Sequence, residues 1–149
     1  MVHFNAHYYV IVGNYGSGKT ELSLSLARRL RQETTGRVAL VDLDIVNPYF
    51  RSAERADLLR SEGIEVLMPS FALTTVDIPA LPAEIQSVFE PGRYDRVVFD
   101  VGGDEVGATA LGRYHPYLLP VRAETKVFYV VNPFRPLSGT EDDICALFE

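Results

Sequence analysis

The sequence contains a single cysteine, Cys145, among its 149 residues. One cysteine cannot build a disulfide framework within the chain, nor the cysteine cluster that a structural zinc or an iron–sulfur group requires. No apolar run approaches the length of about 20 residues that a membrane-spanning helix needs. Residues 1–5 carry no cationic region ahead of a long hydrophobic stretch, which a signal peptide would have. We therefore expect a cytoplasmic chain without a membrane span.

Positive charge is also scarce, because 14 Lys and Arg stand against 20 Asp and Glu, for a formal net charge of −6. A non-specific nucleic-acid surface usually needs a basic face, so this balance argues against nucleic acid as a partner. The chain is 47% hydrophobic and 23% charged, which is typical of an ordinary buried core and not of a disordered chain. Its length fits one domain, residues 1–149.

Short apolar runs alternate with segments of helical periodicity along the chain. The runs are rich in β-branched and aromatic residues, and they cover 8–12, 37–42, 64–68, 96–100 and 126–131. Helical signals cover 19–32, the stretch from Asn47-Pro48 to Ser61, a short segment around Ile85 and Phe89, and the residues after a capping box at 138–141. This alternation predicts a three-layer α/β/α P-loop NTPase fold with a mainly parallel sheet of about five strands. The sequence ends inside the last helical segment, so we expect a domain truncated at its C-terminus.

Residues 13–20 match the phosphate-loop pattern G-x-x-x-x-G-K-[ST] in full. They stand where the mechanism of the pattern requires, after a predicted strand and at the start of a predicted helix. The backbone N–H groups of such a loop converge on phosphate, and the helix N-terminus adds roughly half a positive charge. Lys19 would reach the β- and γ-phosphates, and the Thr20 hydroxyl would bind Mg²⁺. The predicted phosphate-binding residues are Gly13, Asn14, Tyr15, Gly16, Ser17, Gly18, Lys19 and Thr20.

Three carboxylates follow predicted strands. Asp42 and Asp44 come at the end of the second strand, and Asp100 closes the fourth. Ligands of open α/β sheets bind at the carboxyl ends of the strands, so we expect these side chains in the nucleotide site. Asp100 has the form of a Walker B aspartate that holds magnesium through a water, and Asp42 or Asp44 would lie near the same metal. A strand-end cap and a solvated turn are the alternatives that the sequence leaves open.

In this order, the phosphate loop, the segment Val41-Asp42-Leu43-Asp44-Ile45 and the segment Phe99-Asp100-Val101-Gly102-Gly103 resemble the MinD/ParA/CobQ-type (SIMIBI-class) P-loop nucleotide-binding family. The resemblance covers residues 8–135. It implies Mg²⁺ and ATP or GTP as ligands, and a protein partner or a homodimer.

The resemblance also implies roles for individual residues. Lys19 and Asp44 would be the catalytic residues, with Asp44 positioning or activating the attacking water. Asp100 would be the Walker B aspartate, and Gly103 the glycine that senses the γ-phosphate. Residues 104–111 would form the second switch loop.

One position departs from that family. Many members carry a lysine directly after the first glycine of the phosphate loop, and it reaches across a dimer, but here the residue is Asn14. Arg51, Arg113 or an arginine from a partner could supply the missing charge. Such an arginine is worth several orders of magnitude in the rate of phosphoryl transfer. We therefore expect slow hydrolysis by the isolated chain.

These features together predict a nucleoside triphosphatase that acts as a nucleotide-dependent switch. The last strand is followed by Asn132-Pro133-Phe134-Arg135 and not by the Asn-Lys-x-Asp pattern that favours guanine in many GTPases. The sequence does not identify the base, and we take ATP ahead of GTP as the expected nucleotide. Two alternatives stay open. A small-molecule kinase would use a carboxylate after the second strand to take the proton of an acceptor hydroxyl, and a non-hydrolysing scaffold would only bind the nucleotide.

Overall fold

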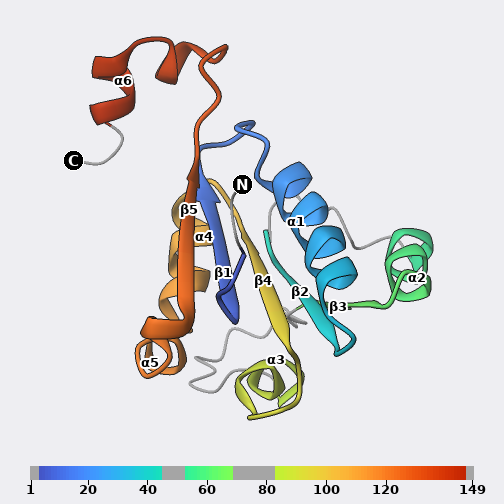
Figure 1. Cartoon of the computed structure of the whole chain (residues 1–149). Helices are drawn as coiled ribbons and strands as arrows, with labels where there is room; N and C mark the ends of the chain where they lie inside the picture. Colours follow the sequence, from blue (N-terminus) through green and yellow to red (C-terminus); the bar gives the residue numbers. More distant parts are fainter. Residues whose placement is uncertain (1–3, 45–52, 69–82, 147–149) are drawn as a thin grey trace.

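A computed structural model describes residues 4–44, 53–68 and 83–146, and within these ranges five strands form one sheet (Figure 1). Every strand pairing is parallel, and the strand order is β3-β2-β4-β1-β5. The predicted parallel sheet is confirmed, and each observed strand boundary lies within one residue of the predicted one. The strands are β1 (Tyr8–Gly13), β2 (Val38–Leu43), β3 (Ile64–Leu67), β4 (Arg96–Val101) and β5 (Thr125–Val130).

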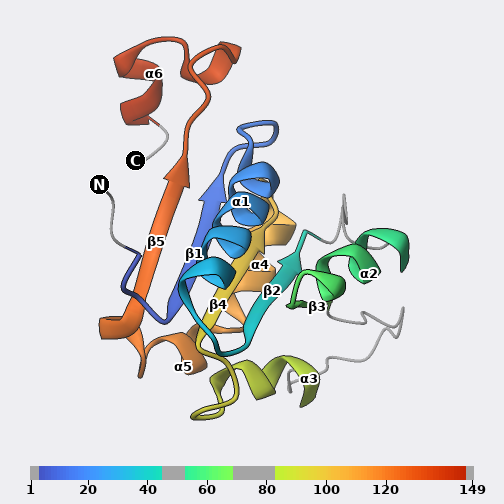
Figure 2. The ribbon, with the colours of Figure 1, turned by 45° about the vertical axis from the view of Figure 1, so that its right-hand side comes forward.

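Helices cover both faces of the sheet, as the three-layer prediction required (Figures 1 and 2). The helices α1 and α2 lie on one face, whereas α4 and α5 lie on the other, and α6 stands beyond the carboxyl end of β5. The helices are α1 (Lys19–Glu33), α2 (Ala53–Ser61), α3 (Ala83–Gln86), α4 (Glu105–Gly112), α5 (His115–Leu118) and α6 (Glu141–Ala146), with 3-10 turns at Ser87–Phe89, Arg122–Glu124 and Pro136–Ser138.

The core consists of two clusters, one on each face of the sheet. Successive side chains of a strand point to opposite faces, and in β1 Tyr9 and Ile11 join the cluster under α1, whereas Tyr8 and Val10 join the cluster on the other face. All four are buried. Burial on both faces explains why the central strands β2, β4 and β1 read as continuous apolar runs and not as alternating patterns.

The segment 104–111, a loop by the resemblance, is helical in the structure. Helix α4 begins after Asp104, whose Oδ1 accepts a hydrogen bond of 2.8 Å from the Gly107 N–H. This side-chain cap satisfies a backbone donor that the first turn leaves without a partner. The sequence analysis also missed α5, a single turn that follows directly on Tyr114, a residue buried in the second core cluster.

The last helix begins three residues after the start of the predicted capping box. The Thr140 hydroxyl accepts the Asp143 N–H at 3.1 Å, and the Thr140 N–H donates to the Asp143 carboxylate at 3.0 Å. The capping box is therefore 140–143, because Ser138 lies in a 3-10 turn and donates its hydroxyl to the Asn132 carbonyl oxygen. The predicted helix start at Asn47-Pro48 lies outside the described residues.

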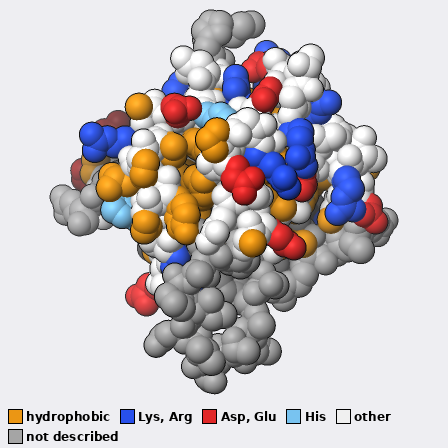
Figure 3. All heavy atoms as spheres, turned by 90° about the horizontal axis from the view of Figure 1, so that it is seen from below, with side chains coloured by type: hydrophobic (Ala, Val, Ile, Leu, Met, Phe, Trp, Pro, Cys, Tyr) orange, Lys and Arg blue, Asp and Glu red, His pale blue; other side chains and the backbone are white. Residues whose placement is uncertain are grey.

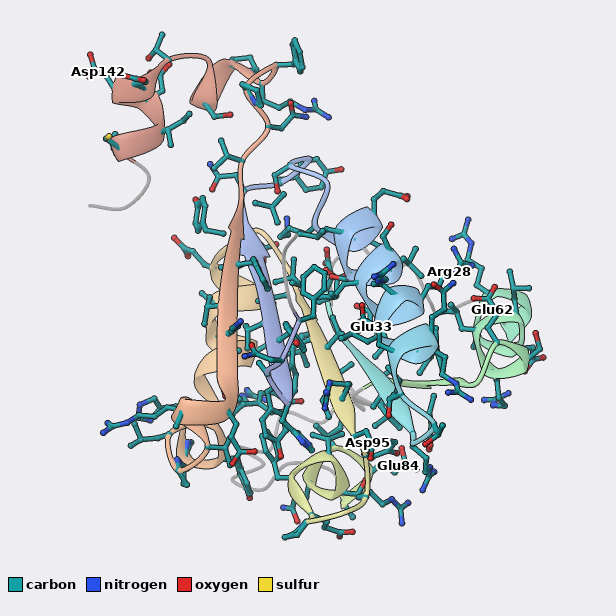
Figure 4. The ribbon with its side chains drawn as sticks, in the orientation of Figure 1. Arg28, Glu33, Glu62, Glu84, Asp95 and Asp142 are labelled. Atoms are coloured by element: carbon teal, nitrogen blue, oxygen red, sulfur yellow. The ribbon has the colours of Figure 1, made fainter. Side chains whose placement is uncertain are left out.

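The surface mixes charges of both signs with exposed apolar groups. Figure 3 shows the face at the amino ends of the strands, where hydrophobic side chains gather between basic and acidic ones. Exposed ion pairs link neighbouring elements: the Arg28 guanidinium of α1 reaches Glu62 after α2 with an N–O distance of 2.7 Å (Figure 4), and Arg37 reaches Glu65 at 2.6 Å. Among the described residues, no helix has the length and hydropathy that crossing a bilayer takes.

Candidate functional site

The phosphate-loop residues connect β1 to α1 at the carboxyl edge of the sheet. The loop turns tightly, since the Ser17 N–H donates to the Asn14 carbonyl oxygen at 3.2 Å. Gly18, the residue before α1, has φ 97°, in the left-handed region that favours glycine. The strand–loop–helix context that the motif needs is therefore present.

Lys19 lies buried under this loop, with 7% of its surface exposed. Its Nζ donates a hydrogen bond of 2.8 Å to the Asn14 carbonyl oxygen. Burial lowers the pKa of the Lys19 ammonium group, and the nearby carboxylates of Asp100, Asp44 and Asp104 oppose that shift. A positive charge is thus held inside the site, surrounded by the carboxylates that end β2 and β4.

Asp100 is the most deeply buried carboxylate of the site, with 1% of its surface exposed. Its two oxygens accept hydrogen bonds from the Thr20 hydroxyl at 2.8 Å and from the Ser23 hydroxyl at 3.1 Å. Burial raises the pKa of Asp100, whereas the two hydroxyl donors and the Lys19 charge oppose the rise. Sequence reasoning missed Ser23, although it follows Thr20 by three residues and so lies on the same face of α1.

The two aspartates after β2 lie at the same edge. Asp42 is 4% exposed and sits beside Asp100 in the register of β2 and β4. Its Oδ1 accepts the Asp44 N–H at 3.0 Å. Asp44 is partly exposed and faces the loop after β4, since a Cβ built on Gly102 would lie 3.5 Å from the Asp44 Cγ. The four residues predicted at the metal, these two with Thr20 and Asp100, therefore share one edge of the sheet.

These carboxylates do not form a preassembled metal cage. Within residues 4–44, 53–68 and 83–146, no group of three or more His, Cys, Asp or Glu side chains is arranged to hold a metal ion. Magnesium commonly binds through one or two protein oxygens and completes its shell with water and phosphate oxygens. The paired oxygens of Thr20 and Asp100 fit that mode of binding.

Gly103 brings the loop after β4 against the phosphate loop. A Cβ at this position would lie 2.6 Å from the Tyr15 nitrogen and 2.8 Å from the Lys19 Nζ. Side-chain carbons do not approach backbone nitrogen so closely, so only glycine fits here without a shift of either loop. The residue predicted to sense a γ-phosphate is thus in contact with the loop predicted to bind it.

A cavity of about 460 Å³ opens between the phosphate loop, Gly103 and the segment after β5. Its lining includes Asn14, Tyr15, Ser17 and Arg135, and its size is within the range of small-molecule sites. The Ser17 hydroxyl is buried and has no hydrogen-bond partner among the described residues. The phosphate loop thus holds a buried polar atom whose hydrogen-bonding capacity the described part of the chain leaves unused.

The structure also places the positions considered for the missing lysine. The Asn14 side chain is turned toward β5, where its Oδ1 accepts the Tyr129 hydroxyl at 3.2 Å. Arg113 is exposed and follows the C-terminal end of α4. Because a helix of eight residues spans ~12 Å, Arg113 lies about that far along the helix from its first turn. Arg51 lies outside the described residues. Sequence reasoning did not assign Arg135, which lies beside the phosphate loop.

The comparisons with known proteins give no match in sequence and a distant likeness in structure. No family model matches the chain, and no curated protein matches it. A solved structure that the chain resembles is the BceF tyrosine kinase domain, with 19% sequence identity and a TM-score of 0.49. The likeness covers 95% of this chain, which spans 62% of the length of that domain. The functional assignment therefore rests on the site itself.

Proposed function

We propose that this chain is a P-loop nucleoside triphosphatase of the MinD/ParA/CobQ type, which binds Mg-ATP and acts as a nucleotide-dependent switch on a protein partner or a second copy. The observation that carries the proposal is the burial of Lys19 and Asp100 under a complete phosphate loop. Charges taken out of water cost several kcal/mol each unless they are compensated. Phosphate would compensate the Lys19 ammonium group, and magnesium would compensate the Asp100 carboxylate. The two buried charges therefore support a magnesium–nucleotide ligand.

Binding would use groups that are already in place. Lys19 would transfer its hydrogen bond from the Asn14 carbonyl to a phosphate oxygen, and the N–H groups of the loop would contact the same phosphate. The Thr20 hydroxyl would be a magnesium ligand, with Asp100 holding a water of the same ion. Bound magnesium would neutralise charge that develops on the phosphates.

Hydrolysis would depend on the position of a water molecule. Asp44 is partly exposed at the edge of the site, and its charge acts on Lys19. We propose that its carboxylate orients the attacking water. The backbone of Gly103 would contact the terminal phosphate and report its loss to α4, which begins two residues later. Catalysis of this kind is positioning and electrostatic stabilisation, with little covalent chemistry for the protein.

The experiment is calorimetric titration with ATP and with GTP in magnesium, followed by phosphate release from the same samples. Asp44→Asn is expected to bind ATP as the wild type does, and to release phosphate at least ~100-fold more slowly, the usual contribution of a positioned acid–base group. Asp57→Asn on α2 is the matched control, because it removes an exposed carboxylate of α2, outside the site. Its turnover should equal that of the wild type.

Other outcomes would select the competing functions. If Asp44→Asn leaves turnover unchanged, its catalytic role is wrong. Tight ATP binding with no phosphate release, even with cell extract supplied, would indicate a scaffold. ATP consumption that rises only when one metabolite is added would indicate a small-molecule kinase, and tighter binding of GTP would overturn the choice of ATP.

A further inference from the structure

The structure assigns a further phosphate contact to Arg135: we propose that its guanidinium binds the phosphates of the nucleotide from the side of β5, and so supplies within the chain the positive charge that Asn14 lacks. The proposal rests on the proposed function, since it names a residue of the same site. It concerns a residue outside both the phosphate loop and the strand-end carboxylates.

Arg135 lies directly against the middle of the phosphate loop. A Cβ built on Gly16 would stand 2.8 Å from the Arg135 Nη2 and 3.0 Å from its Cζ. The guanidinium therefore covers the loop at its second glycine and lines the same cavity as Ser17. Because Gly16 has no side chain, the guanidinium occupies space that the Cβ of any other residue would need.

The backbone that carries Arg135 is held in place by the turn after β5. The Arg135 N–H donates to the Asn132 carbonyl oxygen at 3.1 Å, and its own carbonyl accepts the Ser138 N–H at 3.1 Å. The buried Ser138 hydroxyl donates to the same Asn132 carbonyl. Because β5 pairs directly with β1, this turn lies next to the loop that β1 enters. The arginine is thus presented to the site by a fixed part of the fold.

The charge of Arg135 is not compensated within the described part of the chain. Among the other exposed arginines, Arg28, Arg29, Arg37 and Arg60 form ion pairs with carboxylates, whereas Arg93 and Arg122, like Arg135, form none with a described residue. Arg135 forms none with any described residue, although it lies at a loop that already carries the Lys19 ammonium and a helix N-terminus. The guanidinium and the helix N-terminus at this loop favour an anion, and the planar guanidinium fork suits phosphate oxygens.

Asn14 supports the same interpretation. Its side chain is hydrogen-bonded to the Tyr129 hydroxyl of β5, so it is turned toward the sheet of its own chain. In the family that the sequence resembles, a lysine stands at this position. Here the Asn14 side chain is held instead by a contact within its own chain. The cation at this loop comes instead from Arg135, five residues after the end of β5.

The test is the affinity for ATP in magnesium of Arg135→Ala, measured by calorimetry, with Arg122→Ala as the matched control. Arg122 is exposed at the amino end of β5, so its removal changes the net charge equally without touching the site. We expect Arg135→Ala to weaken ATP binding by about tenfold or more, the effect of losing a hydrogen bond to a charged group. Arg135→Lys should recover part of the loss, and Arg122→Ala should stay within about twofold of the wild type.

Inorganic tripolyphosphate separates a phosphate contact from a contact to the base. It is expected to displace ATP from the wild type, and the affinity derived for tripolyphosphate should fall in Arg135→Ala by about the same factor as that for ATP. If only the affinity for ATP falls, the guanidinium contacts the nucleoside and the proposal is wrong. It is also wrong if Arg135→Ala binds ATP as the wild type does, in which case the proposed function survives. A wild type that binds no ATP overturns the proposed function itself.

Discussion

At the carboxyl ends of the strands, Lys19, Asp42 and Asp100 are 7%, 4% and 1% exposed. In contrast, the ion pair of Arg28 on α1 with Glu62 (Figure 4) and that of Arg37 with Glu65, at the amino ends of β2 and β3, keep 34–53% of their side-chain surface exposed. Exposed pairs contribute ~0–1 kcal/mol to stability. Buried charges carry a desolvation penalty of several kcal/mol each. The buried charges of the first region carry a cost that the proposed ligand would offset, whereas the exposed pairs of the second region add little to stability.

The largest expected effect comes from the buried ammonium. Lys19→Ala removes the donor that would reach phosphate, so we expect the affinity for Mg-ATP to fall by about a hundredfold. Lys126→Ala is the control, because Lys126 is exposed on β5 and contacts only Asn5 in the described hydrogen bonds. Calorimetry on both variants measures the difference. Equal affinities for ATP in the two variants would show that the buried lysine does not serve the ligand.

A second effect comes from the contact between two loops. Gly103→Ala would press a methyl group against the Tyr15 nitrogen and the Lys19 Nζ. Forcing the two loops apart should cost ~1–3 kcal/mol of unfolding free energy and weaken ATP binding as well. Gly112→Ala is the control, because a Cβ at the end of α4 would meet no atom within 4 Å apart from its chain neighbours and the backbone of its own helix. Urea denaturation of both variants checks this, and equal midpoints would contradict the close approach.

A third effect should have opposite signs for folding and for binding. Asp100→Asn removes a desolvated charge but keeps an acceptor for the Thr20 or Ser23 hydroxyl. We therefore expect the unfolding free energy without ligand to rise, while ATP binding in magnesium becomes weaker. Asp95→Asn, at an exposed carboxylate before β4, should show no such rise. A loss of stability in Asp100→Asn would mean that its hydrogen bonds outweigh its burial.

The smallest effect is expected from the exposed pair between α1 and the end of α2. Its coupling energy in a double-mutant cycle of Arg28→Ala and Glu62→Ala should be below ~1 kcal/mol. The hydrogen bond from Arg28 lowers the pKa of Glu62 from its ordinary 4.5. A lowered carboxyl pKa adds stability above pH 4.5 that is lost as the pH falls below it. Urea titrations at pH 7 and in acid measure this, and a coupling that grows in acid would have the wrong sign.

The features that the sequence alone predicted are local ones. The five strands could be read from their continuous apolar runs, and the phosphate loop from its motif and its position between a strand and a helix. The carboxylates could be assigned to one edge because the carboxyl ends of parallel strands meet there. That these carboxylates hold magnesium is still a prediction. The catalytic role of Asp44 is also still a prediction.

The features that sequence reasoning missed depend on tertiary structure. The first turn of helix α4 is held by the Asp104 cap, a contact that forms only once the loop after β4 is in place. The short helix α5 is positioned by the burial of Tyr114 against the sheet, which local sequence does not reveal. The position of Arg135 depends on β5 lying next to β1, and strand order is not written in any local motif. Nothing in the stretch after β5 therefore pointed to the phosphate loop.

The most direct test of the account is titration of the wild-type chain with ATP, once in magnesium and once with the metal removed by chelation. The account predicts binding in magnesium at one site per chain, and an affinity at least about tenfold lower without the metal. Absence of binding in magnesium, or equal affinity with and without the metal, would contradict a magnesium–nucleotide site at the carboxyl ends of the strands.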